Sequence, residues 1–136
     1  MRTWLAIVLL GLSSTVFSAD RLEFTIHKLE SGVEGPTVLV VGGIQGDEPG
    51  GFHAASMLVT HFEVTRGSVW VVPNLNFESI VERSRGVNGD MNRKFAHVKE
   101  NDPDYRAVQR IKALIRDERV DFIFNMHDGS GFYREK

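Results

Sequence analysis

Three side chains that could bind a metal ion follow two apolar segments of the chain. Gln45 and Glu48 lie in the loop GGIQGDEPGG, residues 42–51, directly after the apolar run TVLVV. His127 follows a second apolar run, VDFIFNM, residues 120–126. Ligands of open α/β sheets bind beyond the carboxyl ends of the strands, so we expect these three side chains to converge. They offer an amide oxygen, a carboxylate and an imidazole, which leave a fourth position on a zinc ion open for water.

A zinc site of this kind would favour the hydrolysis of amides. Zinc lowers the pKa of bound water to about 7 and polarises a carbonyl oxygen. The chain has no cysteine, so a zinc site here cannot use thiolate ligands. We expect Gly42, Gly43 and Gly46 to let the backbone turn tightly and approach the metal.

Two other interpretations fit the loop at residues 42–51. It is compatible with a plain connection from a strand to a helix, and a histidine after a strand often has only a structural role. A phosphate-binding loop is disfavoured, because Asp47 and Glu48 place negative charge where the phosphate would bind. The spacing of the residues alone therefore leaves the metal site and the plain connection open.

A second polar cluster lies in SRGVNGDMNRKF, residues 84–95. The fork of an arginine side chain matches a carboxylate, and a neighbouring asparagine adds a directed donor. Arg85, Asn92 and Arg93 are therefore suited to recognise a free carboxylate. The same residues also fit a solvated loop with a turn at Asn88–Gly89.

The apolar pattern predicts four strands. Alternating apolar and polar residues at Leu22–Lys28 indicate a half-buried strand. Continuous apolar runs, typical of strands covered on both faces, occupy Pro36–Val41, Ser68–Pro73 and Val120–Met126. Because helices are expected between these runs, the sequence predicts an α/β domain with a largely parallel sheet.

Two helices are predicted between the strands. One begins at Pro49, which suits the first helical turn. The other has Asp102 as N-cap and Pro103 as its first residue, and ends near Arg119. Residues 74–101 are polar and have no sustained period, so they are expected to form a long irregular segment that carries function.

The first nineteen residues have the pattern of a secretory signal peptide. Arg2 precedes the apolar block Trp4–Leu12, and small residues follow it. This block is shorter than the roughly 20 residues that span a bilayer, so no membrane span is expected after cleavage. The expected organisation is a signal peptide at 1–19 and an exported domain at 20–136.

The net charge of the chain is -2, and the sequence has no dense run of Lys and Arg. It therefore lacks the basic patch that a nucleic-acid-binding protein shows.

Four motifs in order resemble zinc metallocarboxypeptidases of the carboxypeptidase A type. They are the Gly-Gly loop with Glu48 and Pro49, then Arg85, then the segment DMNRKF at 90–95, then a strand followed by His-Asp-Gly. The resemblance is closest to the branch shared with succinylglutamate desuccinylases and aspartoacylases, and it implies a partial carboxypeptidase-like domain, a three-layer sandwich with a mostly parallel mixed sheet. It also implies that Glu48 and His127 bind Zn2+.

The resemblance further implies the roles of the second cluster. Asn92 and Arg93 match the residues that hold the substrate carboxylate, and Arg85 matches the arginine that polarises the scissile carbonyl. Gln45 departs from the family, because it stands where a histidine usually binds zinc. The same replacement, with the HDGSG stretch and an export signal, resembles the cell-shape-determining peptidoglycan carboxypeptidases of helical bacteria.

This resemblance implies a periplasmic enzyme that removes C-terminal meso-diaminopimelate from muramyl tripeptide. Two alternatives stay open: an N-acyl amino acid deacylase of the desuccinylase type, and a non-catalytic module that binds peptide carboxylates. The general base of the family is a glutamate on a later strand, and no glutamate of this sequence matches it. The sequence is therefore expected to be the N-terminal part of a longer enzyme.

Overall fold

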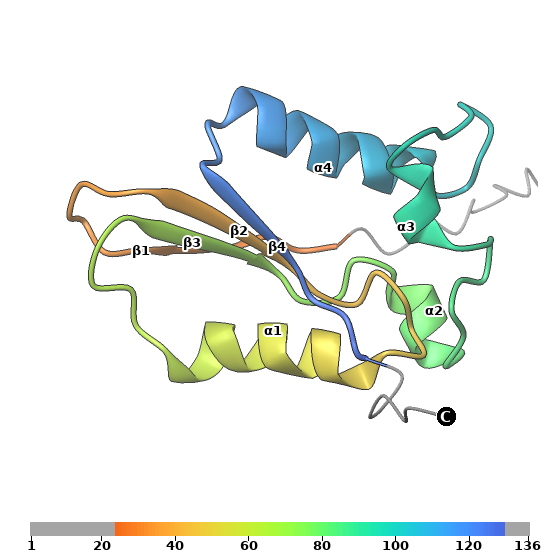
Figure 1. Cartoon of the computed structure of the whole chain (residues 1–136), viewed down its shortest axis with the longest axis horizontal. Coiled ribbons are helices and arrows are strands. Elements are labelled where there is room, and N and C mark those ends of the chain that lie inside the picture. Colours follow the sequence, from red (N-terminus) through yellow and green to blue (C-terminus); the bar gives the residue numbers. More distant parts are fainter. Residues whose placement is uncertain (1–23, 130–136) are drawn as a thin grey trace, which may run out of the picture.

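The computed structural model describes residues 24–129 and arranges them in three layers (Figure 1). Helix α1 (Pro49–His61) covers one face of a central sheet, and helix α4 (Tyr105–Asp117) covers the other face. The predicted α/β sandwich is confirmed. The signal peptide expected at 1–19 lies outside the described residues. Within residues 24–129, no helix is both long and apolar enough to cross a membrane.

The sheet contains four strands in the order β1-β3-β2-β4. Strand β2 (Thr37–Val41) pairs in parallel with both β3 (Ser68–Val72) and β4 (Phe122–Asn125). Strand β1 (His27–Glu30) pairs with β3 in the antiparallel sense. The sheet is therefore mixed and mostly parallel, as the sequence predicted.

The first strand begins later than its alternating pattern predicted. Strand β1 starts at His27, which pairs with Val71 near the end of β3. Phe24 lies before the strand and is buried, and its carbonyl oxygen accepts a hydrogen bond from Arg110 Nη1 at 3.0 Å. The chain at Phe24 thus packs into the core against α4, where sequence alternation alone predicted sheet pairing.

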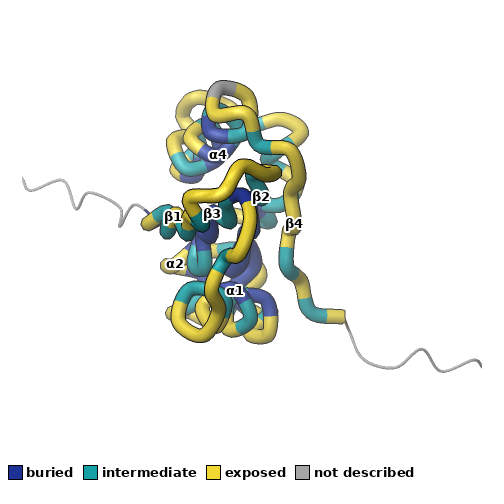
Figure 2. The backbone as a smooth tube through the Cα atoms, turned by 90° about the vertical axis from the view of Figure 1, so that its left-hand side faces the viewer, coloured by how far each residue is buried: buried dark blue, intermediate teal, exposed yellow. Residues whose placement is uncertain are grey.

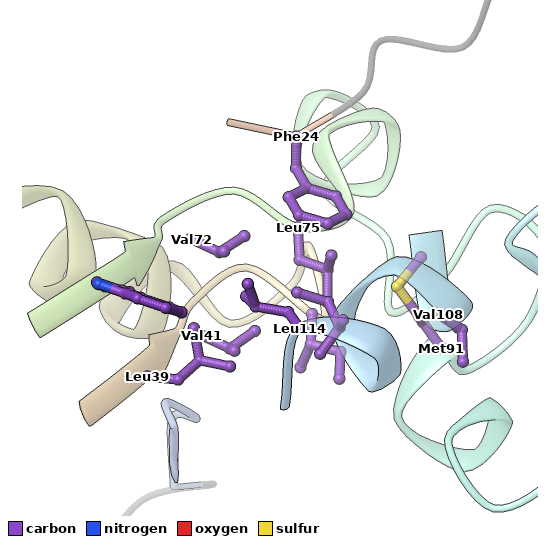
Figure 3. Packing of buried hydrophobic residues seen from close by; sticks show 11 residues of the cluster. Phe24, Leu39, Val41, Val72, Leu75, Met91, Val108 and Leu114 are labelled. Carbon is purple, nitrogen blue, oxygen red and sulfur yellow. The ribbon is translucent and has the colours of Figure 1, made fainter. Parts of the chain in front are cut away.

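Each face of the sheet has its own hydrophobic core. Val40 and Val71 point toward α1 and pack against Ala55. The intervening strand residues point to the other side, where they form the larger cluster with α4 (Figure 3). This alternation follows from the two-residue period of a strand. The larger cluster consists of Phe24, Leu39, Val41, Ile44, Trp70, Val72, Leu75, Met91, Val108, Ile111 and Leu114.

Strand β4 is exposed, and the prediction that it is buried is wrong. Phe122, Ile123 and Phe124 have exposed fractions of 58%, 48% and 56%. Figure 2 shows β4 as an exposed strand beside the layered body of the molecule. In the described part of the chain, β4 forms the edge of the sheet and pairs only with β2. The apolar run thus correctly indicated a strand, but it did not indicate what lies against it.

The segment predicted to be irregular contains two short helices, α2 (Phe77–Val81) and α3 (Met91–Lys94).

The start of α4 also differs from the prediction. Asp104 is the N-cap, and the Oδ1 atom of Asp102 accepts a hydrogen bond from the Asp104 backbone N–H at 2.8 Å. Asp102 and Pro103 therefore form a turn before the helix, and the helix begins two residues later than predicted.

A buried lysine connects α3 to the start of α4. Lys94 Nζ donates to Asp102 Oδ1 and to Asp104 Oδ2, both at 2.8 Å, and to the carbonyl oxygen of Asn88 at 2.7 Å. The side chains of Lys94 and Asp104 are only 12% and 2% exposed. All three donors of the ammonium group therefore have partners, which is the condition for a buried charge to be tolerated.

Replacing Lys94 by methionine should reduce the free energy of unfolding by about 3–5 kcal/mol, because the change removes the cation that balances two carboxylates. Urea denaturation of the purified protein measures this loss. Lys99→Met is the matched control, because Lys99 is exposed, and it should change stability by less than about 0.5 kcal/mol. Equal midpoints for the two variants would show that the network does not stabilise the fold.

The same network should give an alkaline limit to stability. Burial lowers the pKa of Lys94, but its hydrogen bonds to Asp102 and Asp104 outweigh this effect and raise the pKa above 10.5. A group whose pKa is higher in the folded state stabilises fully below its unfolded pKa and loses this effect as pH rises through the folded pKa. The difference in unfolding free energy between wild type and Lys94→Met should therefore stay constant at neutral pH and shrink only above pH 10.5. Denaturation series at increasing pH measure it, and a decrease already near neutrality would contradict the assignment.

Candidate metal centre

The pairing of β2 with β4 places the two predicted ligand segments side by side. Val41, the last residue of β2, is in register with Asn125, the last residue of β4. The backbone N–H of Met126 donates to the carbonyl oxygen of Val41 at 2.8 Å. The loop after β2 and the residue His127 therefore leave the same edge of the sheet next to each other.

The three predicted ligands come together at this edge. His127 Nδ1 lies 3.1 Å from Gln45 Oε1 and 2.7 Å from Glu48 Oε2. Ligand atoms around a tetrahedral zinc ion are about 3.3 Å apart, because each lies at about 2.0–2.2 Å from the metal. The donor atoms thus have the types that zinc accepts, and His127 Nδ1 lies somewhat closer to each oxygen than it would around a bound ion.

The site depends on the amide of Gln45. Among residues 24–129, no three His, Cys, Asp or Glu side chains form a group that could hold a metal ion. Glu48 and His127 supply only two such side chains, and the third predicted ligand in this part of the chain is the neutral amide oxygen of Gln45. The structure brings the predicted ligands together, and metal binding itself stays a prediction.

The loop is glycine-rich because it packs closely against the backbone of α2. A Cβ atom on Gly46 would collide with the carbonyl oxygen of Ser79. The Gly46 N–H donates to the carbonyl oxygen of Ser84 at 2.9 Å. Gly43 has φ +66°, a conformation that favours glycine. The predicted tight turn is confirmed at Gly43, the packing of Gly46 on α2 holds Gln45 in place, and close approach of the backbone to a metal stays a prediction.

The ligands range from buried to accessible. Gln45 is 1% exposed, whereas the side chains of Glu48 and His127 are 14% and 31% exposed. A buried amide needs partners for both of its ends. Gln45 has them, because its Nε2 donates to Asp90 Oδ1 at 2.9 Å while its Oε1 faces His127. The site thus has a buried inner side at Gln45 and an outer side open to solvent.

Glu48 is held by contacts from three directions. Its Oε2 accepts hydrogen bonds from His127 Nδ1 and, at 3.1 Å, from the backbone N–H of Asp128. Its Oε1 accepts from Arg85 Nη1 at 3.3 Å. Asp128 Oδ2 in turn accepts from the backbone N–H of Gly50 in the first turn of α1 at 2.8 Å. These bonds tie the end of β4 to the start of α1.

The predicted carboxylate-binding residues lie next to these ligands, around Asp90. Arg85 Nε donates to Asp90 Oδ2 at 3.2 Å, and Arg93 Nε lies 3.9 Å from the same atom. Asn92 Oδ1 accepts from Asn125 Nδ2 at 3.3 Å. Asp90 also caps α3, because its Oδ1 accepts from the backbone N–H of Asn92. Met91–Lys94 is therefore a short helix, whereas residues 84–90 form a loop that contains the predicted turn at Asn88–Gly89.

The charges of this cluster stabilise one another. Burial raises the pKa of Asp90, but hydrogen bonds from Gln45, the Asn92 backbone and Arg85 outweigh it, so the pKa lies below its ordinary value. Burial also lowers the pKa of Arg85, and its hydrogen bond and attraction to Asp90 outweigh this, so that pKa is raised. Asp90 is therefore anionic and Arg85 cationic at neutral pH.

Three polar residues of the site were not predicted from the sequence. Asp90 and Asp128 lie beside predicted site residues, but the sequence did not show where their side chains point. An Asp two residues before Asn92, at the start of a helix, has the signature of an N-cap and could have been identified. Asn125 gave no signal, because a polar residue at the end of an apolar run is common.

Comparisons with known proteins identify the family of this chain. A family model described as the catalytic region of the carboxypeptidase controlling helical cell shape matches residues 1–136. The search of curated proteins gives no significant match. Among solved structures, product-bound cell shape determinant protein Csd4 from Helicobacter pylori is 40% identical, with a TM-score of 0.76, and the match covers 82% of this chain and 28% of that one.

Two further solved structures match. The mDAP-bound form of Helicobacter pylori Csd4, described as a D,L-carboxypeptidase, is 48% identical over 74% of this chain and 24% of that one, with a TM-score of 0.69. A succinylglutamate desuccinylase/aspartoacylase from Rhodobacter sphaeroides is 26% identical over 76% of this chain and 32% of that one, with a TM-score of 0.63. This chain thus spans less than a third of the length of these relatives.

Gly46→Ala tests the packing role of the loop. The added methyl group would collide with the Ser79 carbonyl, so the free energy of unfolding should fall by about 1–3 kcal/mol. Binding of zinc should weaken in parallel, because Gln45 is adjacent. Chemical denaturation and zinc titration measure the two effects. Gly129→Ala is the control, since nothing lies within 4 Å of its added Cβ, and an equal effect of both changes would contradict the packing role.

Proposed function

Since the chain belongs to the family of carboxypeptidases that control helical cell shape, we propose that it forms the zinc-binding part of a peptidoglycan carboxypeptidase. The substrate is muramyl tripeptide, and the product released is its C-terminal meso-diaminopimelate. The observation that carries the proposal is the convergence of Gln45 Oε1, Glu48 Oε2 and His127 Nδ1 beside a cluster of arginines. The related Csd4 structures from Helicobacter pylori with bound tripeptide and with bound mDAP support this choice of substrate.

In this proposal Gln45, Glu48 and His127 hold one zinc ion, which supplies an activated water and polarises the scissile carbonyl when bound. Gln45 is fixed at the buried side. Glu48 supplies the single negative charge, and its bonds to Asp128 and Arg85 limit its rotation. The three residues therefore act as a rigid platform whose open side faces substrate.

Asn92 and Arg93 bind the free carboxylate of the peptide. Asn92 Oδ1 already accepts a hydrogen bond from Asn125, so its amide N–H groups are directed elsewhere and are suited to donate to an anion. The Arg93 side chain is 83% exposed and offers a planar fork to a carboxylate. A carboxylate clamp next to the hydrolytic centre restricts cleavage to the last peptide bond, which is the property of an exopeptidase.

Arg85 stabilises the charge that develops on the carbonyl oxygen. Its guanidinium lies between Glu48 and Asp90, so it connects the metal side of the site to the carboxylate-binding side. Because two acidic residues hold it, the group is oriented before substrate arrives, which is favourable for stabilising a transition state. The enzyme acts in the periplasm after export by the segment at 1–19.

An N-acyl amino acid deacylase is the second candidate. The match to the Rhodobacter sphaeroides desuccinylase/aspartoacylase favours it, since such substrates also carry a free carboxylate beside an amide. A panel of muramyl tripeptide, N-succinylglutamate and N-acetylaspartate separates the two activities. Hydrolysis of the acyl amino acids without release of meso-diaminopimelate would replace the first candidate with the second.

The full-length protein should release meso-diaminopimelate from muramyl tripeptide, and a strong chelator should abolish the release. Mass spectrometry of the products measures the activity, and added zinc should restore it after the chelator is removed. The zinc content of the purified protein gives an independent readout, for which one equivalent is expected. Full activity in strong chelator would exclude the metal, and binding of the peptide without hydrolysis or zinc would indicate a non-catalytic module.

A further inference from the structure

The amide of Gln45 has a problem of orientation that a glutamate ligand does not have. Its oxygen and nitrogen ends are nearly equal in size, but only the oxygen has a lone pair to give to a cation. Packing alone therefore does not determine which end faces His127 and Glu48. Hydrogen bonds have to determine it.

Asp90 makes the bond that distinguishes the two ends. Its Oδ1 atom lies 2.9 Å from Gln45 Nε2 and accepts its hydrogen bond. If the amide rotated by half a turn, Gln45 Oε1 would face a carboxylate oxygen, and two acceptors would be in contact without a proton between them. An ionised carboxylate accepts hydrogen bonds only, so it permits one orientation of the amide.

Asp90 is itself fixed from the opposite side. Its Oδ1 also accepts from the backbone N–H of Asn92 at 3.0 Å, and its Oδ2 accepts from Arg85 Nε at 3.2 Å. The carboxylate is thus held by a helix end and a cation and cannot rotate away from Gln45. A charged acceptor also polarises the amide, which increases the negative charge on Oε1 and makes it a better ligand.

We propose that Asp90 is a positioning residue for the metal centre, which fixes Gln45 with Oε1 toward the ion and so makes a neutral amide a usable zinc ligand. The inference rests on the proposed zinc site. It also explains why glutamine is compatible with this position, whereas a glutamate would place a second carboxylate against Asp90 and raise the energy of both charges.

A double-mutant cycle on zinc affinity in the full-length protein tests the role of Asp90. Asp90→Asn keeps the size of the side chain and its suitability as an N-cap of α3, but the new amide can donate as well as accept. Both orientations of Gln45 then become possible, so zinc affinity should fall by about 10- to 100-fold. Competition with a chromogenic chelator measures the affinity, and thermal unfolding without metal reports on any general loss of structure.

The decisive measurement is the same change in the Gln45→Glu background. A carboxylate presents oxygen at either end and needs no orientation, and the amide of Asp90→Asn can donate to it. Asp90→Asn should therefore cost less than about 3-fold there, or improve binding, so that the two changes are strongly non-additive. Asp121→Asn is the control, because Asp121 also accepts a backbone N–H, that of Thr37 at 2.7 Å, at the opposite end of β4. It should leave zinc affinity unchanged in both backgrounds.

Three results are distinguishable. An equal loss of affinity from Asp90→Asn in both backgrounds would mean that Asp90 only supports the fold and would overturn the inference. No loss in the Gln45 background, while the wild type binds zinc, would also overturn it but leave the proposed function intact. A wild-type protein that binds no zinc would overturn the proposed function, and the inference with it.

Discussion

The parallel pairing between β2 and β4 is the constraint on which the rest of the site depends. The register that places Val41 opposite Asn125 sets where each chain leaves the sheet. A shift by one residue would turn His127 to the other face of the sheet, because side chains alternate along a strand. The loop is fixed from its other side too, where the Gly42 N–H donates to the carbonyl oxygen of Val72 at 2.8 Å. The pairing of the strands therefore fixes where Gln45 and Glu48 lie relative to His127, and the loop after β2 has little freedom to move them.

Asp90 joins two parts of the site that the chain supplies separately. One of its oxygens contacts Gln45 from the loop after β2, and the other contacts Arg85 from the segment after α2. Since Asp90 also caps α3, any movement of Asn92 and Arg93 changes the environment of Gln45. The network through Lys94 adds a second anchor by attaching α3 to the start of α4. The proposed carboxylate-binding residues are thus held from both ends of α3.

Much of the fold, and the convergence of the three proposed ligands, could be predicted from the sequence. Local patterns determine strands β2 and β3 and the start of α1 at Pro49, and the order of the strands placed Gln45, Glu48 and His127 at carboxyl ends. Contacts between distant segments could not be predicted. The exposure of β4 depends on its neighbours, and the start of β1 depends on its pairing with β3. The bond between Gln45 and Asp90 connects residues 45 positions apart and has no sequence period that would reveal it.

The charge of the proposed ligand set explains why a contact outside it matters. Only Glu48 is negative, while Gln45 and a metal-binding His127 are neutral, so a divalent ion would keep about one positive charge. This remaining charge favours polarisation of a carbonyl oxygen, because it is not cancelled by the ligands. The same ligand set would lower the affinity for the ion, because two of its three ligands carry no negative charge. In the proposed site Asp90 lies one hydrogen bond from the ligand Gln45, so it would strengthen the Gln45 oxygen by polarisation without entering the coordination shell. Asp90 would then raise the affinity for zinc from outside the ligand set, and the ion would keep the charge that favours hydrolysis.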